Sequence, residues 1–409
     1  MRRALWVTSE APDFTVGGGS IRQAHLLAGL ARRFDQVDLV LAGHLSDPEV
    51  AGLLGPVSEV AFEERRAPSS VAVRRLEDVW KAVVVRRPAE VHDRRLERAG
   101  LRRHLEDRVA NGSDPPYDVV HVEHLGLAGI VPAGLGRRLS LDVQNVPSRM
   151  AFQAAALAPG RRQRGLLRAE TAAARRFQAR ALAGLDLLSA VSPADAAELT
   201  GSPAVDRLPA VVIVPNGVDL SRFPVAPLPA EPRLVFTGTL DFRPNVDGIV
   251  WFTHHVLPLV RDRVPDVTLD IAGRRPTAEV RALAGHPGVR LLVDVADMGS
   301  VLAASRIAVV PVRIGTGSRL KALEAMAAGR PVVGTTVGLE GIEIEPGTHA
   351  LVEDEPAALA AAIFGLCRQD GPASGIGRAG RALVETAYAW TGIEDRFGEA
   401  VLALVAGAA

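Results

Sequence analysis

Two patterns of apolar and polar positions alternate along the chain, one typical of strands and one typical of helices. Short apolar runs, such as ALWVTSEA at the amino terminus and RIAVVPV near residue 310, have the length of strands buried on both faces. Between such runs, apolar residues recur every three or four positions, which predicts helices with one buried face. Strand and helix patterns follow one another through most of the chain. This order favours parallel sheets with right-handed crossovers, and therefore an α/β fold.

The pattern is interrupted where proline becomes frequent, between residues 203 and 225 around VVIVPNGVDLSRFP. With 409 residues, the chain exceeds the usual size of one hydrophobic core, so two domains are expected. We predict an N-terminal Rossmann-like domain in residues 1–210 and a second one in residues 211–390. A final helix in residues 391–409 could belong to either half, and packing back on the N-terminal domain is one arrangement.

Two long stretches of the first half have helical spacing. Residues 63–111 are rich in arginine and repeat apolar positions on one face, and residues 147–185 are predicted to form one helix. The segment Arg149–Arg180 holds eight arginines against one acid, Glu170. A basic helical face of this kind suits acidic lipid head groups or a lipid-linked acceptor. A solvated surface paired with acids elsewhere is the alternative.

Composition excludes several classes of protein. Lysine plus arginine (47) equals aspartate plus glutamate (47), so no global field favours nucleic acid as a partner. The single cysteine, Cys367, excludes an internal disulfide and favours an intracellular setting. The apolar run after MRR is too short for a secretory signal, and no uncharged stretch approaches the roughly 20 residues of a membrane span. We expect a cytoplasmic protein, with contact at the inner membrane face left open.

The clearest candidate site is RIGTGSRLKALEAM, which follows the strand RIAVVPV. Gly315 and Gly317 permit close backbone approach, and a helix predicted to start near Ser318 directs its first amides and its dipole into the loop. Arg319 and Lys321 place two cations in the first turn, which suits the two phosphates of a nucleotide diphosphate.

Glu324 follows on the same helix, roughly 9 Å along the axis from the predicted start. A carboxylate there can accept hydrogen bonds from both hydroxyls of a ribose. A glycine turn followed by surface charges is the structural alternative. On its residues alone, the segment is a candidate nucleotide site.

Several motifs in order resemble one family. GTGSRLKALEAMAAGRPVVGTTVGLEGI resembles the donor-binding segment of family 4 retaining glycosyltransferases with the GT-B fold, in the branch that reads G-T-R-L-K-x-L-E-A-M. VPNGVDLSRFP resembles the family's hinge signature, and FTGTLDFRPNVDGIVWF the first strand, turn and helix of its donor domain. The resemblance covers nearly the whole chain. It implies two Rossmann-like domains with parallel sheets facing across a cleft.

The resemblance also implies a donor site, with two departures from the family pattern. Many members carry a glutamate near the transferred sugar, where this chain has Thr316. The family's Arg and Lys after the first donor-domain strand correspond to Thr239 and Pro244, with Arg243 beside them as a substitute cation. The donor-binding candidates are Gly18, Gly19, Arg243, Thr316, Gly317, Ser318, Leu320 and Glu324, with Arg319 and Lys321 as catalytic cations.

In the first half, Gly17, Gly18 and Gly19 follow the first strand, as in the family loop that faces the donor phosphates. A family histidine close to the sugar has several counterparts in the strand VVHVEHLG. Because side chains alternate along a strand, His121 and Glu123 would share one face. The choice among the three polar residues stays open, as does a structural role for the histidine. The catalytic candidate is His121, and the acceptor-side candidates are Glu123, His124 and Asn145.

The implied reaction moves a sugar from a nucleotide diphosphate donor (UDP, GDP or dTDP type) to an acceptor hydroxyl, with retention of the anomeric configuration. The acceptor would be a glycan, a lipid-linked glycan or a small natural product. The helix start and its cations would stabilise the leaving diphosphate. No Asp-x-Asp occurs in a plausible donor loop, so we expect no metal and no cofactor other than the sugar nucleotide.

Two alternatives remain. A GT-B relative could epimerise or hydrolyse the sugar nucleotide, and a degenerate member could bind it without catalysis. A dehydrogenase is disfavoured because no G-x-G-x-x-G follows the first strand.

Overall fold

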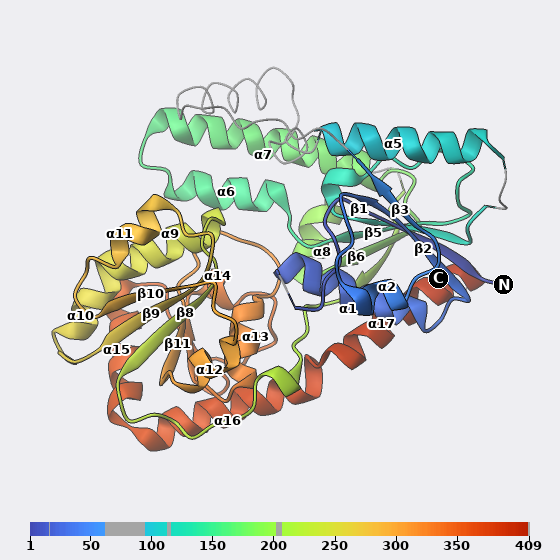
Figure 1. The fold of residues 1–409 in the computed structure, drawn as a ribbon. Coiled ribbons are helices and arrows are strands. Elements are labelled where there is room, and N and C mark those ends of the chain that lie inside the picture. The colour runs from blue at the N-terminus through green and yellow to red at the C-terminus, as the bar shows by residue number, and fades with distance from the viewer. Residues whose placement is uncertain (16, 62–94, 113–115, 202–206, 408–409) are drawn as a thin grey trace. The chain divides into compact units, whose positions relative to one another are not determined.

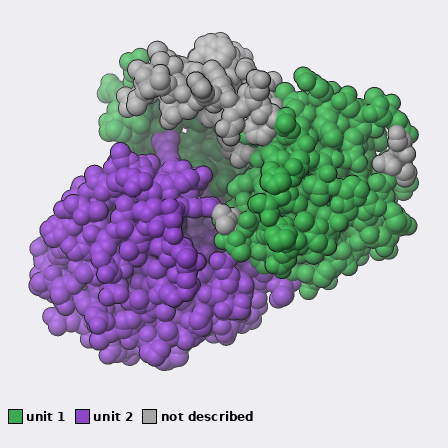
Figure 2. All heavy atoms as spheres, in the orientation of Figure 1, with its two compact units in different colours: residues 1–215, 393–409 green, residues 216–392 purple. Residues whose placement is uncertain are grey.

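The computed structural model describes residues 1–15, 17–61, 95–112, 116–201 and 207–407. The chain divides into two compact units, coloured separately in Figure 2: unit 1 is residues 1–215 with 393–409, and unit 2 is residues 216–392. Each unit is a parallel sheet with helices packed on its faces (Figure 1). The alternating pattern of the sequence therefore predicted the α/β class correctly.

Unit 1 contains a seven-stranded parallel sheet with the order β3-β2-β1-β4-β5-β6-β7. Its strands are β1 (Arg3–Thr8), β2 (Gln36–Ala42), β3 (Val57–Val60), β4 (Val119–Glu123), β5 (Leu139–Val143), β6 (Leu187–Ala190) and β7 (Ala210–Ile213). Its helices are α1 (Gly18–Ala31), α2 (Pro48–Gly52), α5 (Arg95–Ala110), α6 (Pro147–Leu157), α7 (Arg161–Leu182), α8 (Pro193–Thr200) and α17 (Trp390–Ala406). The central strands are buried on both faces because helices cover both.

The two long helical predictions in this half had different outcomes. Of the predicted stretch 63–111, α5 is a helix, whereas residues 62–94 lie outside the described part of the chain. The single helix predicted for 147–185 is wrong, because the structure forms α6 and α7 with a break at residues 158–160. Pro159 lacks the amide hydrogen that a continuous helix would use, and Gly160 before α7 is extended.

Unit 2 contains a six-stranded parallel sheet with the order β10-β9-β8-β11-β12-β13. Its strands are β8 (Arg233–Thr239), β9 (Thr268–Arg274), β10 (Val289–Val293), β11 (Ile307–Val310), β12 (Val332–Gly334) and β13 (Leu351–Val352). Its helices are α9 (Arg243–Trp251), α10 (Leu257–Arg261), α11 (Ala278–Leu283), α12 (Met298–Ala303), α13 (Leu320–Ala327), α14 (Thr336–Leu339), α15 (Pro356–Arg368) and α16 (Asp370–Ala387). The sequence did not predict α16, whose four glycines weaken its helical signal.

The division between the units falls between Pro215 and Asn216. A boundary at residue 210 would cut through β7, which pairs along its length with β6 and so belongs to the first sheet. At the other end, the residues of α17 from Ile393 onward group with unit 1. There Phe397 and Val401 are buried, and Glu394 forms ion pairs with His25 of α1 (2.5 Å) and with Arg32, the residue directly after α1 (2.7 Å).

Candidate active site

In unit 2 the strand order reverses between β8 and β11, since chain connections leave these neighbouring strands in opposite directions. Ligands of doubly wound sheets bind outside the carboxyl ends of the strands at such a switch point. Here the two connections that diverge run from β8 to α9, whose first residue is Arg243, and from β11 to α13. In the second connection, Thr316 to Arg319 lie in the loop and Leu320 to Glu324 lie in the first turns of α13. The predicted donor residues of unit 2 therefore lie on the two loops that the topology favours or at the start of the helices that follow them.

Lys321 is held at the carboxyl end of β8. Its Nζ donates to Asn245 Oδ1 at 2.7 Å and lies 3.9 Å from the centre of the Phe236 ring. Asn245 in turn donates from Nδ2 to the carbonyl of Thr239 at 2.8 Å. A Cβ at Gly238 would come within 2.8 Å of Nζ, so the missing side chain of this glycine makes room for the ammonium. The result is a cation fixed beside the switch point.

Charge and burial shift the pKa values of the two ionisable groups on α13. Burial lowers the pKa of Lys321 well below its usual value, the positive charge of Arg319 lowers it further, and Glu324 opposes both. Burial raises the pKa of Glu324, although Arg222 and Lys321 counteract it. A bound anion would therefore stabilise the charged form of Lys321 strongly, because a buried ammonium has lost much of its hydration.

Helix α13 begins at Leu320 and not near Ser318, which corrects the predicted start. Arg319 is the residue before the helix, with an extended backbone. Its guanidinium folds back to donate to the carbonyls of Thr316 and Val337. It also occupies the space that a side chain at Gly315 would need. In this structure the hydrogen bonds of Arg319 stabilise the loop that precedes it. Lys321, and not Arg319, lies near the carboxyl end of β8.

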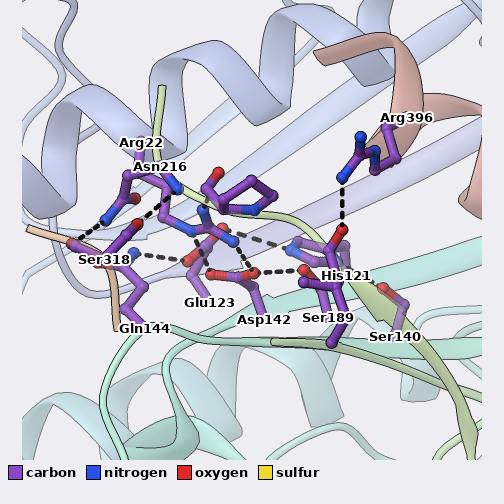
Figure 3. Close-up of polar contacts among 12 residues, drawn as sticks. Arg22, His121, Glu123, Ser140, Asp142, Gln144, Ser189, Asn216, Ser318 and Arg396 are labelled. Atoms are coloured by element: carbon purple, nitrogen blue, oxygen red, sulfur yellow. Dashed lines mark hydrogen bonds and ion pairs between the residues drawn. The ribbon is translucent and has the colours of Figure 1, made fainter. Parts of the chain in front are cut away.

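Asn216 ties the same loop to the start of unit 2. Its backbone N–H donates to Ser318 Oγ and its Nδ2 donates to the carbonyl of Ser318, both at 3.0 Å (Figure 3). These bonds fix the residue directly before the extended Arg319, which explains why the helix starts late. Thr316 and Ser318 are both buried. Gly341, with φ 78°, packs closely against Gly317 from the other side.

Arg243 is the first residue of α9 and is exposed. It lies two residues before Asn245, the partner of Lys321, and so can supply a second cation near the same strand end. Leu320, the first residue of α13, is half-buried.

In unit 1 the strand order reverses between β1 and β4, so the loops after these strands form the corresponding switch point. His121 does not reach it. Its ring is fully buried, with ring centres 4.3 Å from Trp6 and 5.1 Å from Phe397, and its Nδ1 lies 2.6 Å from Ser140 Oγ. Burial lowers the pKa of His121 to about 4. The structure places this catalytic candidate in the core of unit 1.

Glu123 shares the face of β4 with His121, as predicted, and its Oε1 lies 3.4 Å from His121 Nε2. It is fully buried and accepts a hydrogen bond from Gln144 Nε2 at 3.2 Å (Figure 3). Burial, with the nearby charge of Asp142, raises the pKa of Glu123 to about 8. A carboxyl group of this kind holds a proton at neutral pH.

Arg22 and Asp142 form a buried ion pair beneath this group. Arg22 donates from Nε and Nη2 to the two oxygens of Asp142 at 2.9 and 2.7 Å, and Ser189 adds a bond at 2.6 Å. Burial alone would raise the pKa of Asp142, but Arg22 and Ser189 hold it below its usual value. Arg22 also donates from Nη1 to the carbonyl of Pro215 at 3.1 Å, the last residue of unit 1 before Asn216.

His124 lies just beyond β4, at the carboxyl end of the sheet. Its φ of 69° is rare for a residue with a side chain, and such strained positions concentrate at functional sites. Its Nε2 is 3.3 Å from Glu10 Oε2 and 3.3 Å from Gln23 Nε2. Glu10 also approaches Gly19, where a Cβ would lie 3.0 Å from Oε2. Of His121, Glu123 and His124, only His124 therefore lies at the switch point, just beyond the end of β4.

The remaining unit 1 candidates lie at the same edge. Gly18 and Gly19 are the first two residues of α1, after Gly17 with φ 80°, and Asn145 is a half-buried loop residue two positions after β5. Sequence reasoning missed several side chains that complete the two switch points. Phe236, Gly238 and Asn245 lie within the motif FTGTLDFRPNVDGIVWF, but nothing in it pairs them with Lys321. The others belong to no motif and meet their partners only in the fold: Glu10, Gln23, Gln144 and Arg222.

Among the described residues, no group of three or more His, Cys, Asp or Glu side chains is placed to hold a metal ion. No helix in that part of the chain is both long and apolar enough to cross a membrane.

Two parallel, doubly wound units with these switch points define the GT-B fold, and solved structures support it. The sucrose-phosphate synthase of Thermosynechococcus elongatus aligns with 99% of this chain and 100% of its own, with a TM-score of 0.70 and 19% identity. The Anabaena protein HepE in complex with UDP-glucose aligns with 98% of this chain and 100% of its own, with a TM-score of 0.63 and 15% identity.

Residues 231–369 match the family described as Glycosyl transferases group 1. This range lies within unit 2 and contains Asn245, Lys321 and Glu324. The phosphatidyl-myo-inositol mannosyltransferase of Mycolicibacterium smegmatis is 33% identical over 184 residues, which are 42% of this chain and 45% of that protein. A glycogen synthase of Mycobacterium tuberculosis is 26% identical over 48% of this chain and 49% of its own. The chain thus spans about half the length of the curated relatives it matches.

Proposed function

We propose that the protein transfers a sugar from a nucleotide diphosphate donor to an acceptor hydroxyl with retention of the anomeric configuration. The observation that carries this proposal is the placement of Lys321 against Asn245 and Gly238, within the glycosyltransferase domain and at the switch point of unit 2. A partly desolvated ammonium at this edge suits the diphosphate of the donor. The GT-B fold of the chain and its glycosyltransferase relatives agree with this chemistry.

The main requirement of this reaction is to stabilise the charges that develop in its transition state. As the bond between the anomeric carbon and the phosphate oxygen lengthens, negative charge grows on the leaving diphosphate and the sugar becomes cation-like. Lys321 is already fixed and poorly hydrated, so it can stabilise this charge without reorganising. Arg243 is exposed and can add a second cation, and the amides at the start of α13 add their dipole. We propose that these groups replace a divalent metal as the counter-charge.

We assign Arg319 a supporting part in this proposal. Its guanidinium holds the carbonyls of Thr316 and Val337, so it shapes the loop from which the amides point. Thr316 and Gly317 would then face the transferred sugar. Because Thr316 carries no charge, the loop selects among sugars by shape and hydroxyl contacts.

On the acceptor side we propose His124 in place of His121. His124 lies at the carboxyl edge beside Glu10, whereas His121 is enclosed by Trp6 and Phe397. Glu123, the residue before His124, and Asn145, just after β5, would then lie next to the pair of His124 and Glu10.

We propose UDP, GDP or dTDP as the donor nucleotide and a glycan, lipid-linked glycan or small natural product as the acceptor. HepE was solved with UDP-glucose, and the mycobacterial relatives are named as mannosyltransferases and glycogen synthases. The decisive experiment incubates the purified protein with a panel of labelled sugar nucleotides, with and without acceptors of these three classes. Acceptor-dependent release of nucleoside diphosphate is expected. Turnover that ignores every acceptor would point to an epimerase or hydrolase, and an absence of nucleotide binding to a non-catalytic protein.

Glu324 provides a sharper test of the donor site. Glu324→Gln removes the carboxylate proposed to bind the ribose hydroxyls, so donor affinity should fall at least about tenfold, because a hydrogen bond to a charged group contributes about 1.5–3 kcal/mol. The unfolding temperature should stay close to that of the wild type. Calorimetric titration with nucleoside diphosphate measures the change, and unchanged affinity would remove Glu324 from the site. Glu279→Gln, at an exposed glutamate of α11, makes the same charge change and is the control.

Peripheral contact with an anionic membrane through Arg149–Arg180 is a further part of the proposal. Helix α7 carries exposed arginines and packs against α6, whose Phe152 and Leu157 are 61% and 43% exposed. Arginine suits acidic lipid heads and the apolar residues suit the interface. Flotation with vesicles that contain phosphatidylglycerol should carry the protein upward at low salt, and neutral vesicles should not. Failure to float with either would leave the sugar transfer untouched but end the membrane proposal.

A further inference from the structure

Arg330 differs from the other arginines in the interior. The largest fully buried side chains include Arg22, Arg306 and Arg330. Arg22 pairs with Asp142, and Arg306 pairs with Asp370 at 2.5 Å. Within the described ranges Arg330 forms no ion pair, and burial lowers its pKa. Its guanidinium donates only to backbone carbonyls, those of Ala226, Pro227, Ala303, Ser305 and Ala328.

A cavity of about 280 Å³ lies beside Arg330 in unit 2. One wall is formed by residues of α16 that are spaced four, three and four positions apart. Residues with this spacing lie on one face of a helix. The segment 225–228, Gly329 and Arg330 also line the cavity. The residues of α16 with this spacing are Ser374, Arg378, Arg381 and Glu385.

The lining carries an excess of positive charge. Arg378 is exposed and makes no side-chain hydrogen bond or ion pair with any described residue. Arg381 pairs through Nε with Glu385 at 2.6 Å and donates from Nη1 to the carbonyl of Phe223 at 2.9 Å. Glu385 is the one acid of the lining, and it is already paired. Three guanidinium groups therefore face a cavity with one carboxylate between them.

We propose that this cavity binds the phosphate monoester of a small metabolite. Phosphate oxygens suit the planar donor groups of Arg378 and Arg381 and the hydroxyl of Ser374. The guanidinium of Arg330 already donates its hydrogen bonds to backbone carbonyls, so it would attract the phosphate by charge alone. Its buried positive charge has no counter-ion among the described residues, and a bound anion would supply one. Val225, Pro227 and Leu228 offer an apolar wall for the carbon skeleton. The volume is just below the usual range for drug-sized ligands, roughly 300 to 1,000 Å³, so the ligand is small.

The alternative is that Arg330 only fastens segment 225–228 to the body of unit 2. In that case the cavity would bind no anion with measurable affinity. A binding titration with an anion distinguishes these two hypotheses, and neither hypothesis depends on the sugar-transfer activity.

The test is calorimetric titration of the full-length protein with a hexose 6-phosphate, with inorganic phosphate and with the unphosphorylated hexose. Saturable binding is expected for the hexose phosphate, weaker binding for phosphate, and none for the hexose. Arg378→Glu should lower the affinity for hexose phosphate at least tenfold. Arg281→Glu, at an exposed arginine of α11 outside the cavity, makes the same charge change and should have no effect.

The donor site also attracts phosphates, so a further variant separates the two. Lys321→Ala should weaken nucleoside diphosphate binding but leave hexose phosphate binding intact. The proposal is overturned if the wild type shows no saturable binding, if Arg378→Glu binds as the wild type does, or if Lys321→Ala abolishes hexose phosphate binding. The last outcome would assign the anion to the donor site.

Discussion

Lys321 illustrates, at the scale of single residues, how neighbours set the chemistry of a side chain. Burial and Arg319 both lower its pKa, and Glu324 only partly opposes them. In the free protein its ammonium therefore loses its proton at a lower pH than an ordinary lysine, whose pKa is about 10.4. A phosphate at the site would favour the charged form again. The pH dependence of catalysis should report this competition.

The first prediction concerns that pH dependence. Because kcat/KM reports the free enzyme, it should fall as pH rises through the lowered pKa of Lys321, below the pH at which ordinary lysines titrate. Lys321→Arg should move this alkaline limb to higher pH, since a guanidinium stays charged. Lys321→Met should lower kcat about 100-fold or more. An alkaline limb at the same pH in wild type and Lys321→Arg would contradict the assignment. Arg281→Lys, at an exposed arginine of α11, is the control and should leave the limb in place.

The second prediction concerns stability and Glu123. Its pKa is about 8 in the folded protein and about 4.3 in an unfolded chain, so between these values the folded state binds more protons and stability falls as pH rises. His121, with a folded pKa of about 4, acts in the opposite direction, but only below its unfolded value of about 6.5. Between pH 6.5 and 8, Glu123 should therefore lower the free energy of unfolding as the pH rises, without opposition from His121.

Glu123→Gln should therefore flatten the free energy of unfolding between pH 6.5 and 8, measured by urea denaturation at several pH values. The exposed Glu106→Gln, on α5, is the control and should keep the wild-type slope. If the decline persists in Glu123→Gln, another group titrates there.

At the scale of elements, the loop between β11 and α13 is shaped by contacts from outside itself. Asn216 holds Ser318 through two hydrogen bonds, and Gly341 packs against Gly317. These contacts keep Arg319 extended and move the helix start to Leu320. The amides that would face the donor phosphates are therefore positioned by a residue about a hundred positions earlier in the chain.

The third prediction tests this positioning. Asn216→Ala removes the bond to the carbonyl of Ser318 and should lower donor affinity about fivefold to tenfold, the usual effect of one hydrogen bond. Ser318→Ala removes the other bond and should have a similar effect, whereas Ser318→Thr keeps a hydroxyl and should recover most of the affinity. Equal donor affinity in all three variants, measured by calorimetry, would show that the loop holds its form without Asn216.

At the scale of the whole molecule, the chain returns to its first unit at the end. Residues 393–409 group with unit 1, where Phe397 packs against His121 and Trp6. Gly29 of α1 and Gly398 of α17 lie so close that a side chain at either would collide with backbone of the other helix. The stability of unit 1 therefore depends on residues from both ends of the chain.

The fourth prediction separates the units. Phe397→Ala should destabilise unit 1 by about 3–5 kcal/mol, the usual cost of removing a buried aromatic ring. Affinity for nucleoside diphosphate should stay unchanged, because the proposed donor residues belong to unit 2. Scanning calorimetry with and without nucleotide measures both effects. The exposed Glu399→Ala should cost only tenths of a kcal/mol. A parallel loss of nucleotide affinity in Phe397→Ala would argue against this separation.

The sequence by itself determined the α/β class and most strands and helices, because periodicity, glycine and helix signals act over a few neighbouring residues. The same local signals singled out Thr316 to Glu324 as the candidate donor segment, and its role stays a prediction. It failed where those local signals were weak or opposed, as in the glycine-rich α16 and at the break around Pro159. Only the tertiary structure decided that His121 is a core residue while His124 reaches the edge of the sheet. It alone brought Asn245 and Gly238 to Lys321, and Asn216 to Ser318. Such contacts join positions far apart in the chain, and their spacing leaves no local pattern from which to predict them.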